Sequence, residues 1–423
     1  MNKKKILYIH HGKGLGGAPL SLLLLINALD KEKYHPVVLF LHDSQVVELY
    51  KQNNIEIVGI VNRYDFSHTK VWWFRWYHLT YFLRSAWDTF RTEQSVAGYW
   101  LDKIKPDLVH LNTSSLIAWG KVASKKGIPV IWHVREPLAD GYLGFRKWII
   151  KKCVAKYSSK ILPICKHDAL PWKDNPKTCV IYNAVDPKKF DFNIADLLQP
   201  GASPMGDGST SSPRARLLDP LILSLSKDRH YSGPKILFLG GLSQEKGTLV
   251  IFKAFEKVLK QLPKAKLLVA SYFDLDLSKT SYLKKLFPAY KFKVEVANIL
   301  EKIKKSVVLL GPIQDIPQAM AASDLIVFPA TVGHFARPII EAGFMKKPVI
   351  ASDLAPLDEL VVNNQTGYLV DPNDINAWAD KLLLLLTDKD LNKKMGDAGY
   401  NFCIQHFTVS SQKKFIENIY EQF

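Results

Sequence analysis

The chain has 423 residues, 47% of them hydrophobic, and carries a formal net charge of +17 at pH 7. The length allows two domains with a core each, and the longest apolar run, in "PLSLLLLINAL", is about half a membrane span, which excludes a transmembrane helix. The charge favours anionic partners, namely nucleic acid, phosphate-bearing small molecules or an anionic membrane surface, although a solvated basic surface would also explain it.

The cysteine pattern and the N-terminal segment indicate the compartment in which the protein resides. The four cysteines show neither a C-x-x-C motif nor the spacing of a zinc site, so we expect reduced thiols in a cytosolic protein. The N-terminus, "MNKKKILYIHHGKG", has a run of only four apolar residues before His10, and this predicts a first strand and not a signal peptide.

Short aliphatic segments alternate with helix-length stretches along both halves of the chain. Strands that alternate with helices at this spacing indicate βαβ units and a parallel sheet. The expected strands of the first half are 5–11, 35–42, 55–60, 106–112, 128–134 and 159–165, with a helical period at 18–30. Those of the second half are 235–241, 264–271, 306–311, 324–330, 347–353 and 367–370. We therefore predict an α/β protein with two doubly wound domains in tandem.

The boundary between the halves is visible in the composition. In "QPGASPMGDGSTSSPRAR" (199–216), ten of eighteen residues are Pro, Gly or Ser, and such a segment cannot build a core. We place an N-terminal domain at 1–190, a disordered linker or insertion at 191–232, a C-terminal domain at 233–404 and a final helix at 405–423.

An aromatic segment interrupts the first domain within 62–100. The stretch 71–90, "VWWFRWYHLTYFLRSAWDTF", has nine aromatic residues in twenty. At helical spacing Arg75, His78, Ser85 and Thr89 fall near one face, and Trp72, Trp76, Leu79, Leu83 and Phe90 on another. Such a helix can lie in a bilayer interface, and the alternatives are a core helix or the wall of an acceptor groove.

Two strand ends of the first half carry residues suited to chemistry. A glycine loop through Gly12, Gly14, Gly16 and Gly17 precedes a helix, where backbone N–H groups can hold a phosphate. It matches neither a dinucleotide fingerprint nor a P-loop. In "IPVIWHVREPLADG", a histidine ends a strand, and it can orient or deprotonate a hydroxyl or serve the structure alone.

Two loops of the second half carry further candidates. In "ILFLGGLSQEKGTLVIFKAF", Lys246 stands at a helix start, where an ammonium suits a leaving diphosphate, although a surface lysine explains it too. In "TVGHFARPIIEAG", the turn Gly333, His334 and Phe335 can present N–H groups to a phosphate. Glu341 follows on a helix, where a carboxylate can accept hydrogen bonds from a ribose diol or simply face water.

These motifs, in this order, resemble the GT4-type (group 1) retaining glycosyltransferases of the GT-B fold. The resemblance includes "GGAPLSLLLLINAL", "WHVRE", "LGGLSQEKG" and "HFARPIIEAGFMKKPVIASD". It implies two Rossmann-like domains that face one another across a cleft, with the acceptor on the N-terminal side and a nucleotide-sugar on the C-terminal side. It also implies that the last helix crosses back to the first domain.

The resemblance assigns roles to individual residues. Catalytic roles fall to His133, near sugar and acceptor, and to Lys246, which would neutralise the leaving phosphate. Donor contacts would come from Gly16, Gly17, Gly241, Pro312, Ile313, His334, Phe335 and Glu341, and further phosphate or acceptor contacts from Arg135, Glu136 and Arg337. The implied reaction retains the anomeric configuration without metal or cofactor, because the departing phosphate takes the acceptor proton, and a UDP- or GDP-sugar is the co-substrate.

The chain departs from the family pattern at two positions. Gly241 stands where the family often has an Arg, and Gly333 where it often has a first Glu, eight residues before the second. Arg337 and Arg135 are the candidates to replace the missing cation, and His334 is the candidate for part of the carboxylate's role.

The expected function is sugar transfer in cell-surface polysaccharide or glycolipid synthesis by a cytoplasmic enzyme. Segment 71–90 would hold it at the inner face of an anionic membrane, the acceptor would be a glycan or lipid-linked glycan, and nucleic acid is not expected as a partner. Two alternatives remain: a non-catalytic GT-B protein that binds nucleotide-sugar or acts as a scaffold in glycan assembly, and a GT-B enzyme of another reaction class such as an epimerase.

Overall fold

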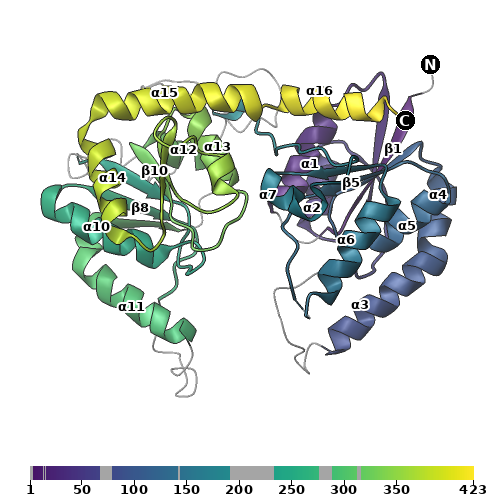
Figure 1. The fold of residues 1–423 in the computed structure, drawn as a ribbon, viewed down its shortest axis with the longest axis horizontal. Coiled ribbons are helices and arrows are strands. Elements are labelled where there is room, and N and C mark those ends of the chain that lie inside the picture. The colour runs from purple at the N-terminus through teal and green to yellow at the C-terminus, as the bar shows by residue number, and fades with distance from the viewer. Residues whose placement is uncertain are drawn as a thin grey trace. The chain divides into compact units, whose positions relative to one another are not determined.

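The computed structural model describes residues 3–12, 14, 16–66, 79–141, 143–190, 233–275, 288–311 and 316–423. The chain forms two compact units, one of Met1–Val185 with Phe407–Phe423 and one of Asp186–His406 (Figure 1). The predicted linker at 191–232, the first part of the aromatic segment (67–78) and the predicted donor contacts Pro312 and Ile313 lie outside the described residues.

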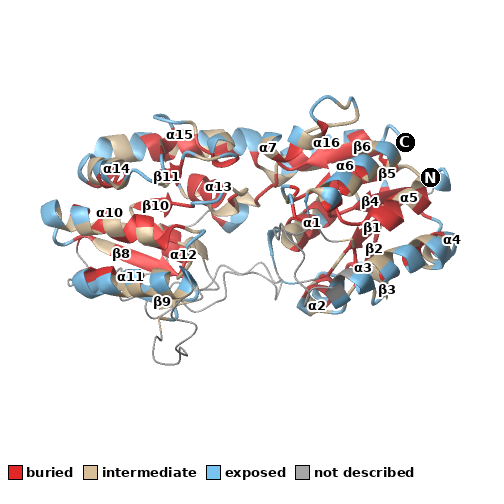
Figure 2. Ribbon diagram, turned by 60° about the horizontal axis from the view of Figure 1, so that its bottom comes forward, coloured by how far each residue is buried: buried red, intermediate tan, exposed pale blue. Residues whose placement is uncertain are grey.

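The first unit is built on a six-stranded parallel sheet. Its strands are β1 (Lys4–His10), β2 (Tyr34–Phe40), β3 (Glu56–Ile60), β4 (Leu108–Leu111), β5 (Val130–Val134) and β6 (Lys160–Pro163), in the order β3-β2-β1-β4-β5-β6. Parallel strands covered on both faces are continuous apolar runs, and Ile6, Leu7, Tyr8 and Ile9 of β1 are accordingly fully buried. Figure 2 shows the same burial along the strands of this sheet.

Helices cover both faces of this sheet. They are α1 (Gly17–Ala28), α2 (Gln45–Gln52), α3 (Leu79–Arg91), α4 (Ala97–Ile104), α5 (Ile117–Lys125), α6 (Phe145–Tyr157), α7 (Lys166–Ala169) and α16 (Val409–Tyr420). Apolar side chains of α1, α2 and α16 share one core with the sheet, and those of α4, α5 and α6 share another. On the second face Gly120 of α5 allows close contact, because a Cβ there would collide with the ring of Trp132 on β5.

The helix of the aromatic segment turns its polar face inward. Ser85 and Asp88 of α3 are buried, where the Ser85 hydroxyl donates to the Asp65 carbonyl at 2.7 Å and the Asp88 carboxylate pairs with Arg63 at 3.1 Å. Leu83 and Phe90, predicted on the opposite face from Ser85, are exposed. The described part of this segment is therefore not a core helix with its apolar face inward.

The second unit repeats the architecture. Its strands are β7 (Lys235–Phe238), β8 (Lys266–Ala270), β9 (Val307–Gly311), β10 (Leu325–Phe328), β11 (Val349–Ser352) and β12 (Gly367–Val370). Its main helices are α10 (Thr248–Gln261), α11 (Pro288–Ile303), α12 (Ile316–Ala321), α13 (Arg337–Phe344), α14 (Ile375–Thr387) and α15 (Lys389–His406). The strand order β12-β11-β10-β7-β8-β9 is the order of the first sheet read in reverse.

Both sheets thus have the doubly wound order, and the predicted Rossmann-like class is confirmed for each unit. In such a sheet the chain leaves in opposite directions on either side of the first strand, and ligands bind outside the carboxyl ends of the two central strands. These pairs are β1 with β4 and β7 with β10.

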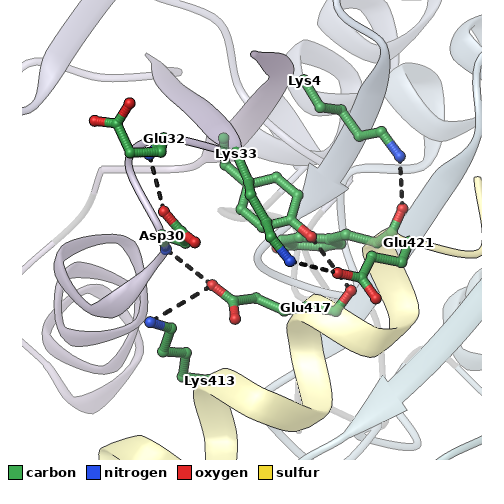
Figure 3. A network of polar contacts seen from close by, with 9 residues as sticks. Lys4, Asp30, Glu32, Lys33, Lys413, Glu417 and Glu421 are labelled. Carbon is green, nitrogen blue, oxygen red and sulfur yellow. Dashed lines mark hydrogen bonds and ion pairs between the residues drawn. The ribbon is translucent and has the colours of Figure 1, made fainter. Parts of the chain in front are cut away.

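The last helix, α16, belongs to the first unit and is tied to it by polar contacts near both β1 and α1 (Figure 3). The Lys4 ammonium donates to the Tyr420 carbonyl at 2.8 Å, the Asp30 N–H donates to Glu417 at 2.8 Å, and Lys33 pairs with Glu421 at 3.1 Å. These contacts fix the helix so that the Tyr420 side chain is fully buried. Within the part of the chain that the structure describes, no helix is both long and apolar enough to cross a bilayer.

Candidate active site

In the second unit the structure brings together Lys246 and His334, which are 88 residues apart in the chain. Lys246 lies in the loop after β7 and His334 in the loop after β10, at the two central strand ends of the sheet. The Lys246 Nζ is 2.5 Å from the His334 Nε2, and the His334 Nδ1 is 3.0 Å from the Val332 carbonyl oxygen. An ammonium only donates, so His334 Nε2 accepts and the ring is neutral.

Backbone contacts hold the two loops in this position. The Thr331 N–H donates to the Glu245 carbonyl at 2.9 Å, and its hydroxyl donates to the Gln244 carbonyl at 3.0 Å. Gly247 has a φ of +80°, and a Cβ there would collide with the Pro329 carbonyl oxygen. Burial lowers the pKa of Lys246, which places a partly desolvated cation where an anionic ligand of this sheet would bind.

Glu341 is buried within α13 and is already paired. Its Oε1 is 2.7 Å from the Nε of Arg337, one turn earlier on the same helix. Burial raises the pKa of Glu341, and the Arg337 guanidinium opposes that rise. Arg337 is therefore engaged with this carboxylate and not held apart as a replacement cation. Phe335 lies half-buried between His334 and the start of α13.

In the first unit the glycine loop ends at the N-terminus of α1. Gly12 and Gly14 have φ values of +81° and +68°, which favour glycine. Gly16 and Gly17 are exposed, and no atom of the described residues lies within 4 Å of a Cβ built on either glycine. The loop therefore leaves room for a ligand to approach the backbone of these two glycines.

His133 and Arg135 lie together at the carboxyl end of β5. Both are buried, and burial together with the Arg135 charge lowers the pKa of His133, so its ring is neutral at pH 7. Arg135 donates to the side-chain oxygens of Asn112 and Asn183, both at 2.5 Å. Burial lowers the Arg135 pKa to about 10, so the guanidinium stays charged, and its acceptors here are neutral amides.

Glu136, the third candidate of this loop, is half-buried against the loop after β4. Its Oε1 accepts hydrogen bonds from the hydroxyls of Thr113 and Ser114, both at 2.8 Å. The carboxylate thereby fixes the β4 loop beside the β5 loop. Its observed contacts support a positioning role more directly than contact with an acceptor.

Sequence models of two families match the chain. Residues 15–189 match the model described as Glycosyltransferase Family 4, and residues 227–402 match the model described as Glycosyl transferases group 1. The chain belongs to the group 1 glycosyltransferases of family 4. The resemblance inferred from the motifs is thus confirmed, and the two matched regions contain every candidate site residue.

Two bacterial glycosyltransferases are among the curated proteins that are similar to this chain. An Escherichia coli UDP-Gal:alpha-D-GlcNAc-diphosphoundecaprenol alpha-1,3-galactosyltransferase is 24% identical over 333 residues, which cover 76% of each chain. The Staphylococcus aureus capsular polysaccharide biosynthesis glycosyltransferase CapM is 24% identical over 188 residues, which cover 44% of this chain and 45% of CapM.

Solved structures share the fold over the whole length. Anabaena HepE in complex with UDP has a TM-score of 0.74 at 18% identity, with 99% of this chain and 100% of that chain covered. A glycosyltransferase from Rickettsia africae has a TM-score of 0.70 at 19% identity, with 100% and 99% covered. These likenesses confirm the GT-B fold class.

At both positions where this glycosyltransferase departs from the family pattern, 241 and 333, neighbouring backbone leaves no room for a side chain. Gly241 has a φ of +56°, and a Cβ there would collide with the Tyr272 carbonyl oxygen. A Cβ on Gly333 would lie inside the 3.0 Å that real Cβ atoms keep, against the Ala355 carbonyl oxygen. Neither position accommodates a side chain without movement of a neighbouring segment.

Sequence reasoning missed the partners of His133. His110 is the penultimate residue of β4 and is fully buried, with its Nε2 3.1 Å from the His133 Nδ1. His10 ends β1 and is also fully buried, and both of its ring nitrogens lack a hydrogen-bond partner among the described residues. The available signal was a histidine at the end of each of three predicted strands, in "KILYIHH", "PDLVHLN" and "IPVIWHV".

Proposed function

We propose that this glycosyltransferase moves a sugar from a nucleotide-activated donor to an acceptor hydroxyl with retention of the anomeric configuration. The observation that carries the proposal is the Lys246–His334 pair at the central strand ends of the second sheet. The field of a preorganised ammonium is strongest on the charge that develops at a leaving diphosphate, and this lowers the barrier. In the free protein His334 serves as the acceptor for that ammonium.

The state of the two acids that the site motifs contain supports a single displacement on one face of the sugar over a double displacement through the protein. A double displacement on the protein would need a carboxylate nucleophile next to a second carboxyl group. Glu341 is paired with Arg337, and Glu136 accepts from Thr113 and Ser114. In the proposed route the acceptor oxygen bonds to the anomeric carbon as the carbon–oxygen bond to the diphosphate breaks, and the acceptor proton goes to the departing phosphate. This route needs no protein nucleophile, and no cofactor or metal is part of it.

We propose UDP as the donor nucleotide, with GDP as the alternative. UDP is bound in the HepE structure, and the E. coli relative is named for UDP-galactose. The proposed acceptor is a lipid-linked or polymeric glycan in cell-surface polysaccharide or glycolipid synthesis, as the names of the E. coli relative and CapM suggest.

The test is turnover of a panel of UDP- and GDP-sugars with lipid-linked acceptors, with product configuration read by NMR. We expect one UDP-sugar to give an α-product from an α-donor. We expect Lys246→Ala to lower kcat at least tenfold, since one preorganised charge contributes about 2–4 kcal/mol. Failure to bind any nucleotide-sugar would refute the proposal. Binding without turnover of any acceptor would favour the scaffold alternative, and an altered donor formed without acceptor would indicate an epimerase.

We further propose that the face formed by α3 and α6 attaches the enzyme to the inner face of an anionic membrane. Both helices pack against α5, on the same face of the sheet (Figure 1). Leu83, Trp87 and Phe90 on α3, and Phe145 and Trp148 on α6, are between 53% and 57% exposed. Exposed apolar surface of this kind suits the boundary between acyl chains and headgroups.

Cations accompany the exposed rings. The Arg91 guanidinium lies 5.9 Å from the Trp87 ring and the Lys152 ammonium 5.0 Å from the Trp148 ring. The combination of exposed rings and cations fits an anionic bilayer better than an apolar protein groove.

Flotation with phosphatidylcholine vesicles, with and without phosphatidylglycerol and at low and high salt, tests the attachment. We expect binding to the anionic vesicles only, weakened by salt and lost in a Trp87→Ser, Trp148→Ser double variant. Phe415→Ser, which removes an exposed ring from α16, is the matched control and should float like the wild type. Equal flotation of both variants would contradict the proposed face.

A further inference from the structure

A chain of buried hydrogen bonds connects the C-terminal helix to His133. The Tyr8 hydroxyl on β1 is 2.7 Å from the Tyr420 hydroxyl on α16, which is 2.7 Å from the Nδ1 of His110 on β4. The Nε2 of His110 is 3.1 Å from the Nδ1 of His133 on β5. All four side chains are fully buried, so water does not compete for these contacts.

The direction of each bond follows from Arg135. Its Nη2 is 3.4 Å from the His133 Nδ1, and a guanidinium can only donate. His133 Nδ1 is therefore an acceptor, and the His110 Nε2 that faces the same atom must donate to it. Burial and the Arg135 charge lower the pKa values of both histidines, so both rings are neutral.

The remaining bonds then have only one consistent arrangement. A neutral His110 with its proton on Nε2 has a lone pair on Nδ1, so the Tyr420 hydroxyl donates to it. The Tyr420 oxygen accepts in turn from Tyr8. The opposite polarity would set an N–H of His133 against an N–H of Arg135.

The proton of His133 is thereby placed on Nε2. This nitrogen is buried and has no hydrogen-bond partner among the described residues, which makes it an unsatisfied donor. A buried donor without a partner costs about 1–3 kcal/mol, and a ligand oxygen would recover that free energy.

We infer that Tyr8, Tyr420 and His110 are positioning residues that hold His133 as a hydrogen-bond donor through Nε2. His133 then orients an oxygen of the sugar substrate, and it does not remove the acceptor proton. This inference rests on the proposed function for the identity of the ligand, and it makes the docked C-terminal helix a part of the site in the first unit. It agrees with a reaction in which the leaving phosphate is the base.

The tautomer can be measured without any activity. NMR of the full chain with ¹⁵N-labelled histidine, recorded at pH 7 without substrate, distinguishes a proton on Nε2 from one on Nδ1. His110→Gln and His133→Gln spectra assign the two signals. We expect both His110 and His133 to carry the proton on Nε2. A His133 proton on Nδ1 would overturn the inference even if the enzyme transfers sugar as proposed.

Turnover tests the relay through two matched pairs of variants. A glutamine at position 110 can donate its amide N–H to His133 and accept from Tyr420, whereas leucine can do neither. We expect His110→Leu to lower kcat/KM about tenfold, as for a lost hydrogen bond in a buried site, and His110→Gln to restore most of it. Equal losses in the two variants, with unchanged near-ultraviolet circular dichroism, would refute the relay.

At position 133 glutamine can donate but cannot act as a base. We expect His133→Gln to keep kcat/KM about tenfold above His133→Leu, for the same reason. If His133 were instead the general base, kcat/KM should be equally low in both variants, and His133→Gln should abolish an acidic limb of the wild-type pH profile. Tyr420→Phe, which removes one oxygen and keeps the ring, provides a milder variant. It removes the donor to His110 Nδ1 and leaves the bond from His110 to His133, so it should lower kcat/KM by less than His110→Leu does.

Discussion

Gly333 offers the sharpest test of how the backbone determines the site. The family often has a glutamate here, and the obvious experiment is to restore it. A Cβ on Gly333 would lie inside the 3.0 Å limit against the Ala355 carbonyl oxygen, a backbone atom that cannot rotate away. The Gly333→Ala change alone must therefore push two loops of the second unit apart.

Overpacking of this kind costs about 1–3 kcal/mol. For a folded unit of this size each kcal/mol lowers the melting temperature by about 2–4 °C. We therefore expect Gly333→Ala to melt at least about 2 °C below the wild type. Gly333→Glu should melt lower still and should show no gain in kcat, because its loop can no longer hold His334 against Lys246.

Gly399→Ala is the matched control for this experiment. Gly399 lies within α15 of the same unit, and a Cβ there would lie at least 3.8 Å from the described residues that pack against this helix. Alanine in a helix interior is favoured by about 0.5–1 kcal/mol, so this variant should melt at or above the wild type. The experiment compares thermal melts of the three variants and the wild type, together with the turnover of Gly333→Glu. A Gly333→Ala protein that melts with the wild type, or a Gly333→Glu protein with raised turnover, would refute the steric reasoning.

Three further outcomes follow from the contacts of the second unit. Arg337→Ala should destabilise the protein by roughly 1–3 kcal/mol at pH 7, because the buried Glu341 carboxylate loses its partner. Urea unfolding should show a smaller loss at acidic pH, because the pKa of Glu341, already raised by burial, rises further and protonation removes the charge. The kcat of the wild type should fall as pH rises through the pKa of Lys246, which burial places below that of an ordinary lysine, and Lys246→Arg should shift that fall to higher pH.

The strands and the strand ends could be predicted from the sequence because their signals are local. Buried parallel strands are uninterrupted apolar runs, and the residues that follow them must lie at one edge of the sheet. The same reasoning located Lys246 and His334, although it did not give their contact. The Arg337–Glu341 ion pair has the i,i+4 spacing of a helical pair and could also have been inferred.

The remaining features depend on contacts between distant segments. Tyr420 reaches His110 across 310 positions in the chain, and no periodicity near either residue indicates that contact. The collisions at Gly241 and Gly333 likewise depend on where the backbone of Tyr272 and Ala355 runs. The sequence shows only that a glycine stands at each position. The structure shows that a larger residue there would collide with neighbouring backbone.

The two glycine departures also explain how one site can lose two family residues and keep its charge balance. The family often has a cation at position 241 and an anion at position 333, so replacing both with glycine removes one charge of each sign. Lys246 then remains as a partly buried cation held by a neutral His334, and its field on a leaving diphosphate is neither reinforced nor opposed from these two positions. Under the proposed function the site would lack a directional contact on the sugar, and His334, whose two ring nitrogens contact Lys246 and the Val332 carbonyl, does not supply one in the free protein.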